Sequence, residues 1–206
     1  LDVVVSGSQK AFMIPPGLSF MAFSHKALAK QQTNPNSRFY WDVTLGLQYQ
    51  VTGQTPFTPP ISLYFGLQEA LKMLEEEGLE KVLVRHRNYR DMVRSSIKAM
   101  GLELFTKDAF ASNAVTSICA PPTIGANAIR KYMLEEFNII LAGGQEKLNN
   151  VIFRMGHLGY VRELDLISVL AALELTLVKF RFDLQLGSGV HKAQEILLKY
   201  HISKQE

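Results

Sequence analysis

The chain has 206 residues, of which 47% are apolar and 20% are charged, enough to bury one substantial core or two small ones. Its 22 Lys and Arg residues against 19 Asp and Glu residues leave a formal charge of only +3. So small an excess gives no reason to expect nucleic acid or another acidic partner.

Two short apolar segments open the chain. Residues 2–5 are β-branched after the first position and are followed by Ser6-Gly7, and residues 18–23 follow the turn Pro15-Pro16-Gly17. The pattern predicts two buried strands joined by a turn. A polar stretch then leads into the aromatic run at residues 39–41.

Two helices are predicted next, separated by one glycine. Prolines at positions 56, 59 and 60 precede a helical repeat that starts at Ile61 and ends before Gly78. A second helix is predicted from Leu79 to Met100. We expect a hinge at the glycine, with one domain over residues 1–77 and another over residues 78–206. The basic residues of the second helix are expected to form a solvated face; they are Lys81, Arg85, Arg87, Arg90 and Arg94.

The rest of the chain mixes strands and helices, which predicts an α/β or α+β sandwich. Strands are predicted at residues 102–105, 115–120, 139–142 and 151–155, and helices at residues 126–137, 164–182 and 190–200.

Two features of this region bear on where the protein works. The longest apolar stretch, residues 164–177, contains Asp165 and Glu174 and is shorter than the about 20 apolar residues of a membrane span, so no membrane segment is predicted. Cys119 is the single cysteine, which excludes an internal disulfide and fits a reducing, cytoplasmic location.

The five histidines of the chain do not have the spacing of metal ligands, so no metal site is predicted.

Lys10 is the leading candidate for chemistry. It ends the run Ser6-Gly7-Ser8-Gln9-Lys10, just after a predicted strand. A lysine there is more often a plain surface residue, but in α/β sheets ligands gather outside the carboxyl ends of strands. A lysine amine that can be neutral at working pH is a nucleophile able to form an imine with a carbonyl compound.

The segment around Lys10 resembles the lysine segment of the class V aminotransferases, the pyridoxal-phosphate enzymes of the alanine–glyoxylate, serine–glyoxylate and serine–pyruvate type. The resemblance extends over Asp2, residues 6–11, Pro15-Pro16-Gly17 and Ser24. It implies that Lys10 binds pyridoxal 5'-phosphate as an imine and later moves the substrate proton. It also implies that Gln9 lies against the cofactor phosphate.

Two further segments resemble the same family. Residues 54–64 resemble the part that enters the neighbouring subunit's active site in a homodimer, which implies a phosphate contact by Thr58 across the dimer. Thr55 is a weaker candidate, because many relatives have a tyrosine there. Residues 151–159 resemble the small-domain strand whose arginine, here Arg154, holds the substrate α-carboxylate through two parallel donors.

In the family the lysine lies near the middle of the protein, so the resemblance implies a C-terminal half. It would comprise the remainder of a fold-type-I large domain, strands plus helix, followed by an α+β small domain. The whole protein would move the amino group of alanine or serine to glyoxylate or pyruvate, and this piece alone is expected to be inactive. The alternative is a truncated, catalytically incompetent subunit for dimerisation or assembly.

Overall fold

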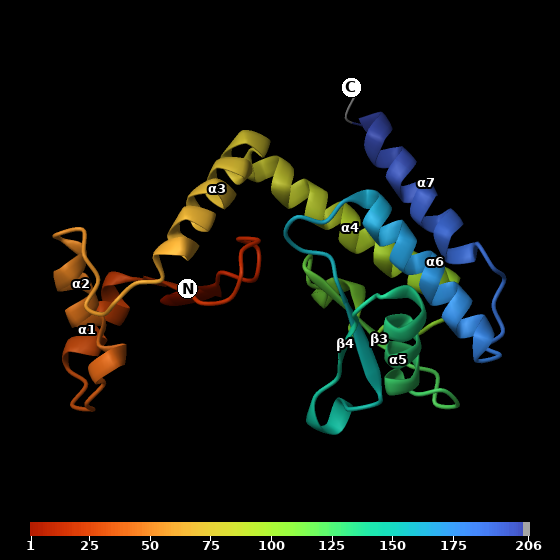
Figure 1. The fold of residues 1–206 in the computed structure, drawn as a ribbon, viewed down its shortest axis with the longest axis horizontal. Coiled ribbons are helices and arrows are strands. Elements are labelled where there is room, and N and C mark those ends of the chain that lie inside the picture. Colours follow the sequence, from red (N-terminus) through yellow and green to blue (C-terminus); the bar gives the residue numbers. More distant parts are fainter. Residues whose placement is uncertain (204–206) are drawn as a thin grey trace. The chain divides into compact units, whose positions relative to one another are not determined.

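The computed structural model describes residues 1–203 (Figure 1). The chain forms two compact units: the first is Leu1–Glu76, and the second begins at Glu77. The predicted boundary after residue 77 lies beside this division. The assignment of the units to a cofactor-binding domain and a small domain stays a prediction.

The first unit opens with a β-hairpin. β1 (Val3–Gly7) pairs antiparallel with β2 (Ser19–Phe23), so that Val5 lies opposite Met21. The strands lie where the sequence predicts them, but the prediction that they are buried is wrong, since Val5 is 66% and Met21 51% exposed. Strand propensity is local, whereas burial depends on a second layer that the hairpin cannot supply.

Three α-helices complete this unit. α1 (His25–Gln32) starts after Ser24 and α2 (Val43–Gln50) after Asp42, and both caps accept a backbone N–H of the first turn. The sequence analysis missed these two short helices, because neither buries a residue and so neither shows a clear apolar repeat. α3 (Ile61–Glu77) begins at the predicted residue.

α4 (Leu79–Ala99) follows α3 after Gly78 alone, which has a φ of 86°. This confirms the two predicted helices and the glycine between them. The expectation that the basic residues of α4 form a solvated face is wrong for Arg94, which is 5% exposed, and Arg85 and Arg90 are half-buried.

The second unit contains a three-stranded antiparallel sheet in the order β3-β5-β4. β3 (Val115–Cys119) and β4 (Ala142–Gly143) flank β5 (Ile152–Gly156). The strand predicted at 102–105 is wrong: only an isolated bridge at Leu104 pairs with the sheet. The strand predicted at 139–142 is reduced to β4.

Helices pack on this sheet and on one another (Figure 1). α4 packs against α6 (Glu163–Lys179) and α7 (Ser188–Ser203), while α5 (Ala126–Phe137) packs against β4, β5 and α6. The core lies among these elements, and its largest fully buried side chains include Tyr89, Met92, Ile97, Ile118, Ile129, Met133, Phe153, Met155, Leu170 and Leu173.

A buried carboxylate joins α6 to the start of α7. Glu174 is 3% exposed, and its two oxygens accept backbone N–H groups of Gly187, Gly189 and Val190 at 2.6, 2.7 and 3.2 Å. A negative group that satisfies free N–H donors at a helix N-terminus is favourable, so Glu174 fixes where α7 begins.

Among residues 1–203, no helix is both long enough and apolar enough to cross a membrane.

Candidate active site

Lys10 lies in a tight turn directly after β1, and Ser8 organises that turn. The Ser8 hydroxyl is fully buried, donates to the carbonyl of Pro15 at 2.8 Å and accepts the N–H of Leu18 at 3.2 Å. The Lys10 N–H donates to the carbonyl of Gly7 at 3.1 Å. The backbone of Lys10 is therefore fixed, while its side chain is exposed in this unit.

Gln9 lies next to the lysine and folds back over Gly7. A Cβ at Gly7 would lie 2.8 Å from Oε1 of Gln9, so a glycine leaves room for the carboxamide. On the far side of the turn, Ile14 lies against Gly66 of α3, and Leu63 lies against Gly17. The lysine turn is thus packed on the first half of α3.

The second predicted segment leads into that same helix. Thr55 and Thr58 are both exposed, and the Thr55 hydroxyl donates to the carbonyl of Phe57 at 2.7 Å. The Phe57 ring contacts Phe39 and Tyr40, with centroids 5.7 and 4.7 Å away. The hydroxyl of Thr55 is already engaged locally, whereas Thr58 presents its hydroxyl on the surface beside an aromatic cluster.

Arg154 lies in the second unit, on the central strand β5, where it pairs with Ser117 of β3 and Ala142 of β4. It is half-buried, and its Nε donates to the carbonyl of Gly143 at 2.9 Å. Among the described residues no carboxylate forms an ion pair with it. Within residues 1–203 the charge of Arg154 is therefore not balanced by a carboxylate, and its side-chain hydrogen bond to Gly143 uses Nε only.

A second arginine supports the same edge of the sheet. Arg130 of α5 donates from Nε to the carbonyl of Leu141 at 2.8 Å. A Cβ at Gly143 would lie 2.7 Å from Nη1 of Arg130, so this close approach requires glycine. Arg154 therefore holds a carbonyl of the short strand β4, and Arg130 holds the carbonyl of the residue just before it.

The structure thus brings Gln9 and Lys10 together in one turn and places Thr55 and Thr58 before the helix on which that turn packs. Sequence reasoning missed Ser8 and Arg130 as supports of these residues. Ser8 stands inside the recognised run, but serine is mostly a surface residue, and only the folded turn shows that it is buried.

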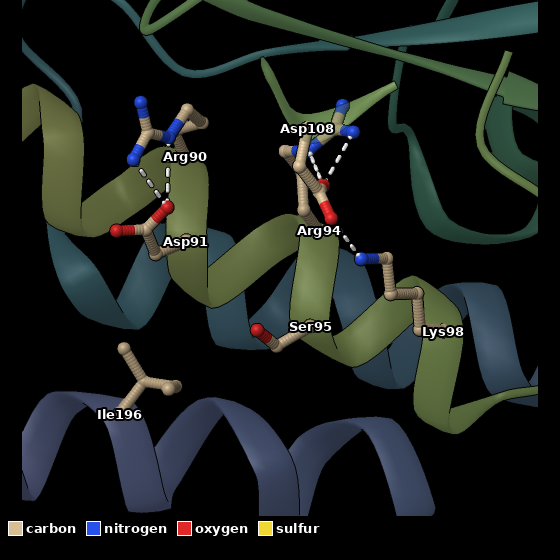
Figure 2. A pocket seen from close by; sticks show the side chains of 7 residues that line it. All are labelled: Arg90, Asp91, Arg94, Ser95, Lys98, Asp108 and Ile196. Atoms are coloured by element: carbon tan, nitrogen blue, oxygen red, sulfur yellow. Dashed lines mark hydrogen bonds and ion pairs between the residues drawn. The ribbon is translucent and has the colours of Figure 1, made fainter. Parts of the chain in front are cut away.

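A cavity of about 340 Å³ lies elsewhere, on α4, and none of the predicted site residues lines it. Figure 2 shows Asp108 between Arg94 and Lys98. One Asp108 oxygen accepts from Nε and Nη2 of Arg94 at 2.9 and 2.7 Å, and the other binds Lys98. These two cations lower the pKa of Asp108, the Lys98 hydrogen bond most. Within residues 1–203 no group of three potential metal ligands is assembled.

Comparison with known proteins identifies the family of this chain. The model of the aminotransferase class-V family matches residues 1–163. A Synechococcus sp. (strain PCC 6716) protein named soluble hydrogenase, small subunit, is 42% identical over 96% of this chain and 51% of its own length. The serine–glyoxylate aminotransferase of Arabidopsis thaliana is 36% identical over 98% of this chain and 51% of its own length.

A similar fold is found in solved structures. The crystal structure of pyridoxamine–pyruvate aminotransferase from Mesorhizobium loti matches with a TM-score of 0.87 and 27% identity, over 95% of this chain and 51% of that one. The chain spans about half the length of the curated relatives it matches. Its α/β fold is that of the fold-type-I pyridoxal-phosphate aminotransferases over half their length, and the chain belongs to the class-V aminotransferase family.

Proposed function

We propose that the protein to which these residues belong is a pyridoxal-phosphate-dependent aminotransferase that moves the amino group of alanine or serine to glyoxylate or pyruvate. The observation that carries the proposal is Lys10, exposed in a turn whose backbone the buried Ser8 holds at the end of β1. Relatives named as amino acid–glyoxylate aminotransferases support this substrate class.

The donor groups of the first unit fit pyridoxal 5'-phosphate. Lys10 offers the amine that binds its aldehyde carbon, Gln9 offers a carboxamide to the phosphate, and Thr58 offers an exposed hydroxyl. Once bound, the cofactor supplies an electron sink for the bond to the substrate Cα. Gln9 and Lys10 share one turn, so a group held by both would be fixed at two points.

Each residue then has a defined task. The Lys10 amine would hold the proton taken from the substrate Cα and return it, as a general acid and base. Arg154 keeps its Nε on the Gly143 carbonyl, which leaves the Nη groups to bind the substrate carboxylate. In a homodimer, Thr58 would contribute its hydroxyl to the phosphate in the neighbouring subunit.

Covalent labelling tests the proposal. The full-length polypeptide is incubated with pyridoxal phosphate, reduced with borohydride and digested, and the modified peptide is mapped by mass spectrometry. We expect the label on Lys10, together with transamination between alanine or serine and glyoxylate. In Lys10→Arg both should vanish, because a guanidinium does not form the imine.

The matched control is Lys30→Arg, a change of the exposed lysine in the last turn of α1 that should retain label and activity. A full-length protein that is never labelled on Lys10 would overturn the proposal. The 206-residue chain, treated in parallel, is expected to show no transaminase activity by itself.

A further inference from the structure

Two consecutive residues of α4 hold both backbone groups of Gly159, in the segment that follows β5. The Gly159 N–H donates to Nε2 of His86 at 3.0 Å, and its carbonyl accepts from Nη1 of Arg85 at 3.1 Å. Gly159 is buried and has a φ of 78°, a conformation that favours glycine. The segment 157–161 is therefore attached to α4 through both backbone groups of a single residue.

The hydrogen bond from Arg85 to the Gly159 carbonyl does not depend on pH in the range where histidine takes up a proton. Nε and Nη2 of Arg85 donate to the Glu77 carboxylate at 2.6 and 2.8 Å, and its guanidinium lies over the Tyr89 ring, 5.7 Å from the centroid. The hydrogen bond to Glu77 raises the pKa of Arg85 above its usual value. Arg85 thus stays charged and in place wherever an imidazole titrates.

The hydrogen bond from the Gly159 N–H to His86 forms in only one protonation state of the imidazole. Its Nδ1 lies 2.8 Å from the carbonyl of Val82, which can only accept, so Nδ1 carries the proton. Nε2 receives the Gly159 N–H, so Nε2 carries none. Only the neutral Nδ1–H tautomer makes both bonds, and a second proton on Nε2 would turn the acceptor into a donor that faces the Gly159 N–H.

The groups around His86 come from three directions. On α4 these are the adjacent cation Arg85 and the Tyr89 ring, whose centroid is 6.3 Å from that of His86, while Arg90 of the same helix acts on His157. On the segment itself is His157, which interacts electrostatically with His86. The carboxylates Glu77 and Glu163 act on Arg85 and Tyr89, respectively.

His157 provides an internal reference in the same segment. It is fully buried, its Nδ1 donates to the Asn113 carbonyl at 3.0 Å, and its Nε2 accepts from the Thr116 hydroxyl at 2.9 Å. Burial lowers its pKa to about 4. His157 therefore stays neutral while an ordinary imidazole takes up a proton, and the start of the segment stays attached to β3.

We propose that His86 is a pH-sensitive positioning residue: its neutral imidazole accepts the Gly159 N–H and so holds the segment 157–161 on α4, and its protonation breaks this hydrogen bond and leaves Gly159 attached to the helix through Arg85 alone. The inference rests on the second unit alone and is independent of the proposed catalytic function. The segment begins three residues after Arg154, and His157 keeps its start attached to β3, so the change is confined to the part of the segment around Gly159.

Nuclear magnetic resonance on the 206-residue chain tests this directly. Long-range ¹H–¹⁵N spectra identify the tautomer of His86, and amide exchange, corrected for the intrinsic effect of pH, reports the Gly159 hydrogen bond. We expect the Nδ1–H tautomer in mild base and an about tenfold loss of Gly159 protection as His86 becomes protonated. The Phe153 amide of β5 should keep its protection, which shows that the fold is intact.

Variants separate the effect of His86 from general acid sensitivity. In His86→Gln a side-chain oxygen can accept the Gly159 N–H without titrating, so protection should persist in acid. His191→Gln, which changes an exposed histidine on α7, should behave as the wild type. An Nε2–H tautomer, or Gly159 protection that stays constant while His86 titrates, would overturn the proposal, and both readings come from the wild-type chain.

Discussion

Ser8 is the residue on which the position of Lys10 depends. Its hydroxyl bridges the Pro15 carbonyl and the Leu18 N–H, and its own N–H donates to the Leu18 carbonyl at 3.0 Å. One buried side chain therefore closes the turn that carries the lysine. A buried polar side chain whose hydrogen bonds are all made stabilises the fold. When it is removed, the buried groups that it bonded are left without a partner, and this lowers the free energy of unfolding.

We expect Ser8→Ala to loosen this turn without changing β1. The substitution leaves the Pro15 carbonyl and the Leu18 N–H without their side-chain partner, so amide protection of Ile14 and Leu18 should fall about tenfold. Hydrogen exchange with peptide-level mass spectrometry measures this. Ser37→Ala, at an exposed position, is the control, and equal exchange in both variants would contradict a role for Ser8.

At the scale of elements, α4 does more than cover the sheet. Arg94 of this helix is buried and binds Asp108 through Nε and Nη2 (Figure 2). Its Nη2 also donates to the Thr106 carbonyl at 2.6 Å. These bonds attach residues 106–108, which follow the predicted strand at 102–105, to the helix. A guanidinium at this depth needs partners, and Asp108 supplies the charge.

The Asp108 interaction predicts a pH-dependent contribution to stability. The hydrogen bonds from Lys98 first and then from Arg94 hold the pKa of Asp108 in the folded state below its usual range, so the contribution is present above the ordinary pKa of a carboxyl group and is lost as the pH falls through the lowered pKa. Asp108→Asn should therefore lower the melting temperature near neutral pH, and the difference from wild type should shrink toward zero in strong acid.

Thermal unfolding over the range of about pH 2.5 to 7 measures that difference. Asp183→Asn, at an exposed position, is the matched control and should leave the melting temperature close to wild type throughout. If the Asp108→Asn difference were as large in strong acid as near neutral pH, the carboxylate would not be the stabilising group.

For the whole molecule, the apolar core is unevenly distributed. Among the described residues of the first unit, Ala70 is the one buried apolar residue. The core cluster lies entirely in the second unit, between Tyr89 and Ala193. Burial of apolar surface is the main driving force of folding. The two units therefore differ in how far they can stabilise themselves.

We expect the two units to behave differently when produced separately. A chain of residues 77–206 should unfold in one cooperative thermal transition, because it contains the whole core cluster. A chain of residues 1–76 should show a broad, weakly cooperative change, since it buries little apolar surface. Circular dichroism melts measure both, and a sharp transition of the first piece would contradict this account.

Local patterns predicted much of the secondary structure. Proline before Ile61, glycine at residue 78 and the apolar repeats of α3, α4 and α5 gave these helices nearly to the residue, because helix signals act over a few neighbouring positions. The short helices α1 and α2 were missed, and the strand predicted at 102–105 is not formed. Short helices depend on their caps and strands depend on distant partners, and neither is visible in the spacing of apolar residues.

The sequence by itself determined the candidate residues Gln9, Lys10, Thr58 and Arg154 and the family they indicate, since that information resides in short runs of residue types. Only the tertiary structure decided that Ser8 is buried beneath the lysine turn and that His86 holds Gly159 from 73 positions away. Hydrogen bonds over such separations follow from how helices and strands pack, and no local pattern specifies them.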